Sequence, residues 1–204
     1  YNVCKARPFP YKKFGLLVGF RQLNLVKSAD FRNELMSNIP IPSSNSAFVG
    51  IFADIPVRMT HFSLRSEITI NNNNFVAAQS NIDGDTDVFI TLLTVQSPVS
   101  IRYTLPTVIW RPFFNVGPNF SYNIKNTSSI YRTRIENNVI IIDKPVQYKL
   151  LSDYSIGYCL GLGFQYNLTY KKTISTEFRY CRTLTPSDNK LMQNSIDFLF
   201  GFTF

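Results

Sequence analysis

The stretch IGYCLGLGFQYNL, residues 156–168, alternates an apolar side chain at every even position with a small or polar one at every odd position. A period of two is typical of a β-strand. At ~3.3 Å per residue the segment extends about 43 Å, and with a 45° tilt it rises ~30 Å, which matches the hydrocarbon core of a membrane. Strands in soluble proteins usually end after about five or six residues. This strand is therefore long enough to cross a membrane.

Further segments with the same alternation bring the number of predicted strands to eight. They cover residues 14–21, 47–55, 62–70, 88–103, 110–124, 174–181 and 195–204. Proline is a difficulty in two of them, because it has no N–H for the ladder. Pro98 interrupts one strand, and Pro112 and Pro118 lie on the apolar face of the next, where we expect β-bulges.

The connections between these strands alternate in length. Short ones are predicted near residues 56–61, 105–108 and 169–173, and long polar ones near residues 26–46, 71–87, 125–154 and 182–194. This alternation is typical of outer-membrane barrels, whose short turns lie in the periplasm and whose long loops lie outside the cell. The third long loop contains two apolar runs around Asn137-Asn138, which predict a hairpin that extends two strands above the membrane.

Side-chain size indicates which face of the strands points outward. Charged residues make up 17% of the chain, against about 25% in soluble domains, and aromatic residues make up 15%. The alternative is a soluble barrel of lipocalin type with its apolar face inside. A narrow eight-stranded lumen holds glycines, amides and paired charges more easily than rows of Phe and Tyr. We therefore predict an all-β, eight-stranded antiparallel up-and-down transmembrane β-barrel over residues 11–204, preceded by a periplasmic N-terminal extension at residues 1–10.

Two groups of side chains follow from this orientation. The polar face should carry a network of charges inside the lumen, formed by Arg21, Arg65, Glu67, Arg102, Arg111, Glu177, Arg179 and Asp197. Aromatic side chains near the periplasmic strand ends should form a girdle at the membrane interface, formed by Phe14, Tyr103, Trp110, Tyr166, Tyr170 and Phe204.

The chain has three cysteines. Cys159 and Cys181 face the lumen from neighbouring strands, and they stand directly opposite each other if the turn centres on Tyr170. Cross-strand Cα atoms approach to about 4.5–5.5 Å, within reach of a disulfide, and the periplasm is oxidising. We predict a bridge; the alternative is two small side chains that fill the lumen. Cys4 is left over, either free or paired with a partner.

The charges and the single histidine bear on the class of function. The net charge is +8, but Lys and Arg are scattered without a basic stripe, which favours anionic lipid or lipopolysaccharide head groups over nucleic acid as partners.

His61 falls in a predicted turn, and neither a catalytic triad nor a Cys/His metal cluster can be assembled, so we expect no enzyme activity and no cofactor. Residues 83–87 carry three carboxylates; a solvated turn is favoured over calcium binding because Gly is misplaced and the closing Glu is missing.

Two stretches resemble a known family. Residues 97–103 (SPVSIRY) and 111–118 (RPFFNVGP) resemble the core of the PorT-like outer-membrane β-barrel domains, which are common in Bacteroidota. Residues 158–166 and 176–180 resemble the family's glycine-rich hairpin, and Phe204 resembles the terminal aromatic residue that the barrel-assembly machinery reads. The resemblance covers about residues 12–204 and implies a bacterial outer-membrane location. Family members include type IX secretion factors and barrels of unknown role.

An eight-stranded barrel leaves no wide aqueous channel, so function should reside in the loops and the lipid face. We expect a non-enzymatic accessory or structural subunit of an outer-membrane assembly for secretion, uptake or barrel insertion. Its partners would be lipid, lipopolysaccharide and other outer-membrane proteins. The alternatives are a small transporter or ligand-binding barrel, and a surface adhesin in which the third long loop carries binding.

Overall fold

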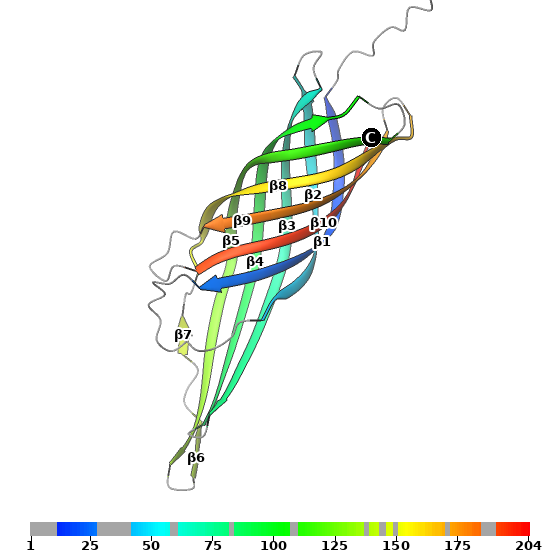
Figure 1. Cartoon of the computed structure of the whole chain (residues 1–204). Helices are drawn as coiled ribbons and strands as arrows, with labels where there is room; N and C mark the ends of the chain where they lie inside the picture. Colours follow the sequence, from blue (N-terminus) through cyan, green and yellow to red (C-terminus); the bar gives the residue numbers. More distant parts are fainter. Residues whose placement is uncertain are drawn as a thin grey trace, which may run out of the picture.

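The computed structural model describes residues 12–27, 42–57, 61–81, 84–106, 110–136, 139–142, 146–148, 151–169, 172–184 and 191–204. Within them a closed antiparallel barrel of eight strands is formed, in which each strand pairs with its neighbours in sequence and the first pairs with the last (Figure 1). No helix in this part of the chain is long and apolar enough to cross a membrane. The barrel strands are β1 (Lys13–Lys27), β2 (Ser44–Pro56), β3 (Phe62–Asn81), β4 (Gly84–Thr104), β5 (Trp110–Glu136), β8 (Tyr154–Asn167), β9 (Thr173–Leu184) and β10 (Leu191–Thr203).

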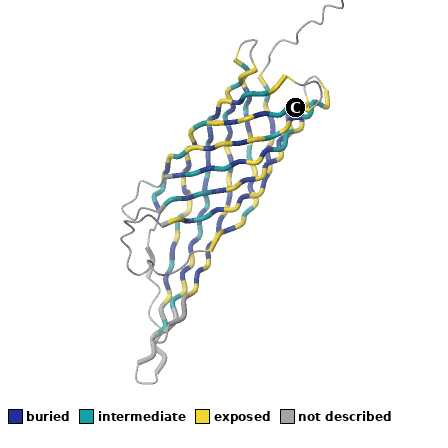
Figure 2. The backbone as a smooth tube through the Cα atoms, in the orientation of Figure 1, coloured by how far each residue is buried: buried dark blue, intermediate teal, exposed yellow. Residues whose placement is uncertain are grey.

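The apolar face of the strands is the outer face of the barrel. Phe164, Phe178 and Phe200, one on each of three consecutive strands, are 53%, 56% and 42% exposed. Exposed and buried residues alternate along every barrel strand, as Figure 2 shows. This is the orientation that the sequence predicts, and it leaves the small, polar and charged side chains to fill the lumen.

Three strands are much longer than the rest. β3, β4 and β5 have 20, 21 and 27 residues, whereas the other five have between 12 and 15. Their surplus length lies at one end, the loop end, where they continue as a narrow sheet beyond the rim (Figure 1). We call this the sheet extension; it comprises residues 72–81 of β3, 84–93 of β4 and 125–136 of β5. At ~3.3 Å per residue it projects about 30 Å along the strands.

The sheet extension corrects one sequence-based expectation and supports another. The long loop predicted for residues 71–87 is wrong, because residues 62–81 and 84–104 pair as one continuous hairpin. The hairpin predicted around Asn137-Asn138 is present, since β6 (Val139–Ile142) pairs with the end of β5. A short strand, β7 (Val146–Tyr148), pairs with β5 closer to the barrel.

The prolines are accommodated without the bulges expected for them. Pro112 and Pro118 pair regularly with β8, and Pro98 pairs with Asn119 inside an unbroken β4. The register shift lies instead between Leu93 and Thr94 of β4, at the base of the sheet extension. A bulge increases local twist, which fits a place where three strands leave the closed barrel.

Candidate functional site

The middle of the lumen holds two groups of buried ion pairs. The first joins β1 to β10, where the Arg21 guanidinium donates to both carboxylate oxygens of Asp197 at 2.8 and 2.7 Å. Arg21 also donates to Asn71 Oδ1 at 3.1 Å. Arg21 is 3% exposed and Asp197 is fully buried. A bidentate pair of this kind fixes both side chains in one geometry.

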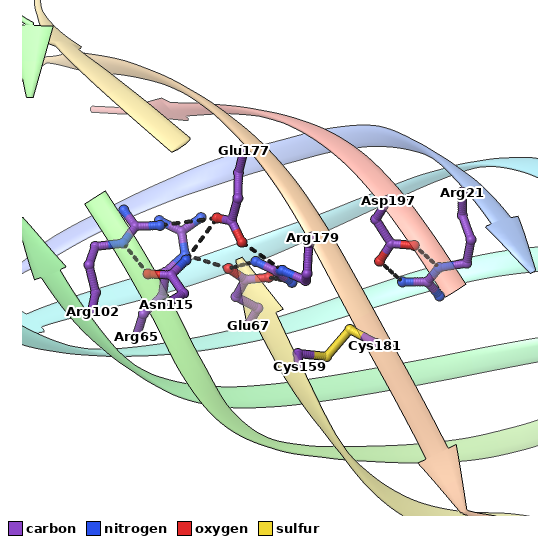
Figure 3. Close-up of polar contacts among 10 residues, drawn as sticks. All are labelled: Arg21, Arg65, Glu67, Arg102, Asn115, Cys159, Glu177, Arg179, Cys181 and Asp197. Carbon is purple, nitrogen blue, oxygen red and sulfur yellow. Dashed lines mark hydrogen bonds and ion pairs between the residues drawn. A yellow bond between two sulfur atoms is a disulfide. The ribbon is translucent and has the colours of Figure 1, made fainter. Parts of the chain in front are cut away.

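The second group is a chain of three arginines and three carboxylates, and Figure 3 draws all of them except Asp54. Glu67 accepts from Arg65 and, at 2.7 and 2.8 Å, from Arg179. Arg179 also donates to Glu177 at 2.7 Å, and Glu177 lies 3.2 Å from Arg102. The chain ends at Asp54, 3.5 Å from Arg102. Each buried charge therefore has at least one opposite partner, as burial in low dielectric requires.

Three phenylalanines stack on these arginines inside the barrel. The guanidinium carbons of Arg65 and Arg102 lie 3.8 Å from the ring centres of Phe52 and Phe113. In the same way Arg21 lies 4.9 Å from the ring centre of Phe48. Such stacks add to the stability of a desolvated cation.

A glycine provides the space for each ring in the narrow lumen. A Cβ on Gly19 would lie 2.6 Å from Cζ of Phe48, and a Cβ on Gly163 would lie 2.4 Å from Cζ of Phe113. The lumen is thus too narrow for most of the aromatic residues, as the sequence indicates, but not for all of them.

The two cysteines on β8 and β9 are joined. Cys159 and Cys181 are register partners with a Cα–Cα distance of 4.1 Å, and their sulfur atoms form a disulfide. Both side chains are buried in the lumen. Tyr170, on which the predicted register depends, lies outside the described residues, as does Cys4.

Toward the loop end the lumen changes from polar to apolar. A buried cluster, here called the apolar plug, consists of Leu23, Leu25, Phe75, Ala77, Val88, Ile90, Leu92, Ile130 and Leu151. The outer face changes in the opposite sense: on β1 the exposed Phe20 is followed by Gln22 and Asn24. Apolar side chains face outward where lipid surrounds the barrel and inward where water does. This inversion marks the level at which the strands leave the membrane.

The outer face of the sheet extension carries an apolar patch of its own. Val76, Phe89 and Tyr131 are 55%, 42% and 41% exposed, and the rings of Phe89 and Tyr131 meet edge to face with centroids 5.6 Å apart. Between this patch and the lipid-facing band lie the polar side chains of Asn72, Asn74, Thr91 and Thr127. Because of these side chains the patch is separate from the lipid-facing surface.

Of the six aromatic residues predicted for the girdle, the five that the structure describes lie at the turn end, and Tyr170 lies outside the described residues. Trp110 stacks on Tyr166 with ring centroids 5.0 Å apart. The backbone N–H of Phe204 donates to the carbonyl of Phe14, so the chain end closes onto β1 there. Tyr103, at the end of β4, packs on a neighbouring ring of β3.

All residues of the predicted charge network except Arg111 lie in the two groups of ion pairs in the middle of the lumen. Arg111 is half-buried at the turn end of β5. Sequence analysis missed Asp54, because the alternation in residues 47–55 was irregular. It also missed Phe48 and Phe52 of β2, whose side chains lie in the lumen. In the register these residues stand across from Gly19 and Gly15 of β1, and this signal becomes visible only when the strand pairing is known.

The described residues offer little for metal or acid–base chemistry. No three His, Cys, Asp or Glu side chains among them are grouped in a way that could hold a metal ion. Residues 84–87 belong to β4 and not to a loop, while Asp83 lies outside the described part of the chain. His61 stands next to Tyr103 at the turn end, with ring centroids 6.3 Å apart.

A closed eight-stranded barrel with an apolar outer wall leads to comparison with membrane proteins. The family model described as outer membrane protein beta-barrel domain matches residues 10–189. The chain belongs to this family. As an outer-membrane β-barrel it lies in the bacterial outer membrane, surrounded by lipid and lipopolysaccharide.

Several solved structures of outer-membrane β-barrels are similar to this chain. Neisserial surface protein A is 14% identical to this chain, and the match covers 93% of this chain and 95% of that protein's chain with a TM-score of 0.46. Ail, the attachment invasion locus protein of Yersinia pestis, solved with the heparin analogue sucrose octasulfate, is 8% identical, with coverages of 95% and 99% and a TM-score of 0.44. The N-terminal barrel of Pseudomonas aeruginosa OprF is 10% identical, with coverages of 91% and 96% and a TM-score of 0.34. At these identities and TM-scores nothing further about this chain follows from the likeness, and no curated protein matches the chain.

Proposed function

We propose that this outer-membrane β-barrel is a non-enzymatic accessory subunit that binds a partner protein through its sheet extension. The observation that carries the proposal is the extension itself, which projects about 30 Å beyond the barrel rim and has a packed apolar interior. Loops and projecting elements on a rigid barrel are where such proteins carry function. The apolar patch of Val76, Phe89 and Tyr131, separated from the lipid, supplies a contact surface.

The filled lumen supports this function over transport. Ion pairs occupy the middle of the barrel and the apolar plug occupies the loop end, so a solute would have to displace both. The carboxylates of Glu67, Glu177 and Asp197 are each held by arginines, which leaves them unsuited to general acid or base catalysis. We therefore keep the transporter as an alternative and propose no enzyme activity.

The orientation proposed for the barrel places the sheet extension outside the cell. Short connections lie at the end that holds Lys12 and Phe204, and outer-membrane barrels keep such turns in the periplasm. The termini would then be periplasmic, with residues 1–10 as a short extension before a barrel domain of residues 11–204. The motifs in residues 97–103 and 111–118 support membership of the PorT-like group of Bacteroidota, with protein transport as the process.

Comparison of the full chain with a trimmed barrel tests the role of the extension. In the trimmed variant an Asn-Gly turn replaces residues 72–93 and a short Gly-Ser linker replaces residues 125–152. The pairings that close the barrel remain, so both proteins should show the same heat-dependent gel shift. After cross-linking in native membranes and mild-detergent purification, mass spectrometry should find an outer-membrane partner with the full chain that the trimmed barrel loses.

A lone barrel from native membranes would contradict the subunit role. If the full chain instead binds a molecule supplied from outside the cell, and the trimmed barrel does not, the adhesin alternative replaces it. The two functions share the sheet extension and differ in where the partner comes from.

A further inference from the structure

Among the residues that the structure describes, one edge of the sheet extension has no strand paired with it. β2 pairs with β3 only as far as Phe48 and Asn71, and the N–H of Asn74 donates to the Ser44 hydroxyl at 3.1 Å. From residue 75 to residue 81 no pairing between described residues covers this edge of β3. The opposite edge of the extension is covered, because β6 and β7 pair with β5. The open stretch is about 23 Å long at ~3.3 Å per residue.

The backbone groups on this edge are arranged as a strand would require. In an antiparallel sheet, alternate residues direct both N–H and C=O toward the same neighbour. Since the N–H of Asn74 points to the β2 side, the N–H and C=O of Val76 and Ala78 point there as well, and by the same alternation those of Ala77 point toward β4. The edge thus repeats a donor and an acceptor about every 7 Å.

This edge has none of the features that usually prevent strand addition. Natural sheets protect open edges with lysine, proline or a bulge. Residues 71–81 read NNNNFVAAQSN and contain no charged residue and no proline, and the bulge of the extension lies on the β4–β5 side. Beside the edge lies the apolar patch, with Val76 on β3 itself and Phe89 across from it on β4.

We propose that the β3 edge accepts an extended, uncharged segment of a partner protein as an added antiparallel strand. Main-chain hydrogen bonds to Val76 and Ala78 would provide affinity, and side chains of the segment would pack beside Val76 and Phe89. The acyl chains of lipid cannot make these bonds, since they have neither donors nor acceptors. A second copy in the same membrane points the same way, so its β3 would offer a parallel ladder, which is less stable per residue. The inference rests on the function proposed above.

Backbone hydrogen exchange tests the added strand directly. The probe is a blocked synthetic peptide with the sequence of residues 72–81, which is soluble, uncharged and able to pair with the edge. In the free barrel the amides of Val76 and Ala78 should exchange fast and that of Ala77 slowly. Saturation with the peptide should slow exchange at Val76 and Ala78 by about tenfold or more, and a scrambled peptide with alternate prolines should have no effect.

A pair of variants separates the backbone edge from the side-chain patch. Val76→Pro removes an N–H that points away from β4, so it should leave the fold intact and weaken peptide binding by about tenfold. Val76→Thr keeps the N–H and a branched side chain, and it should bind like the parent. The heat-dependent gel shift checks that both variants are folded.

Three results would overturn the inference. The first is slow exchange of the Val76 and Ala78 amides in the free barrel, which would mean that the edge is already occupied. The second is peptide binding that does not slow the exchange of these amides. The third is the absence of saturable peptide binding. Capture of a partner from native membranes shows whether only this inference fails or the proposed function fails as well. If that partner is lost on trimming but retained by Val76→Pro, the extension binds its partner in another way.

Discussion

At the scale of single residues, the lumen charges depend most strongly on their partners. Removing one member of a buried ion pair leaves an uncompensated charge, which costs about 3–5 kcal/mol. We expect Asp197→Asn to lower the free energy of unfolding by about 3 kcal/mol, because Arg21 then keeps only neutral acceptors. Urea unfolding in lipid vesicles, followed by fluorescence of Trp110, measures the change.

The control for this prediction removes both charges. Arg21→Met combined with Asp197→Leu should be less destabilised than Asp197→Asn, since apolar residues can replace a buried pair at little cost. If Asp197→Asn unfolded at the same urea concentration as the parent, the pair would have no role in stability.

The disulfide gives a second prediction at the residue scale. Cys159 and Cys181 are 22 residues apart, and cross-linking a loop of that size stabilises a protein by about 3 kcal/mol. Replacing both with serine should lower the urea midpoint by a corresponding amount. The parent alkylated after reduction should be heavier by two labels than the parent alkylated without reductant, and the serine variant should show no such difference. If Cys159 and Cys181 react without reductant, the bridge is contradicted.

At the scale of elements, the sheet extension should depend on its inward face. Ile90 is buried in the apolar plug, and the adjacent residue of β4, Phe89, is exposed on the outer face of the extension. Ile90→Asp places an unpaired charge in an apolar cluster, so we expect proteases to cleave the extension while the barrel stays intact. Phe89→Asp, one position away on the opposite face, should leave the extension resistant. Equal resistance in both variants would contradict the packing described for the plug.

The extension is also where sequence analysis failed, for a physical reason. Residues 71–74 are four asparagines, and a long polar run of this kind predicts a loop. Above the membrane the solvent is water, so the alternation reverses: Phe75 and Ala77 point inward and the asparagines at positions 72 and 74 point outward. A period of two was present throughout, but its polarity changes where the lipid ends.

At the scale of the whole molecule, the barrel should not conduct ions. The two groups of ion pairs and the apolar plug together occupy the described lumen from its middle to the loop end. We expect the purified chain to give no reproducible conductance step in a planar bilayer. A porin inserted under the same conditions controls for the bilayer, and a reproducible step from this chain would favour the transporter alternative.

The sequence by itself determined the strands that cross the membrane, their outward apolar face and most of the lumen charges. Strict alternation over many residues fixes which side chains share a face, since a shift by one position would exchange the two faces of every strand, and side-chain size indicates which face is the outer one. The tertiary structure alone decided which charges pair, as Arg21 meets Asp197 only when the first and last strands close the barrel. It also decided the open β3 edge, because an edge depends on where the neighbouring strand ends, and that property belongs to two strands together and not to the sequence of either.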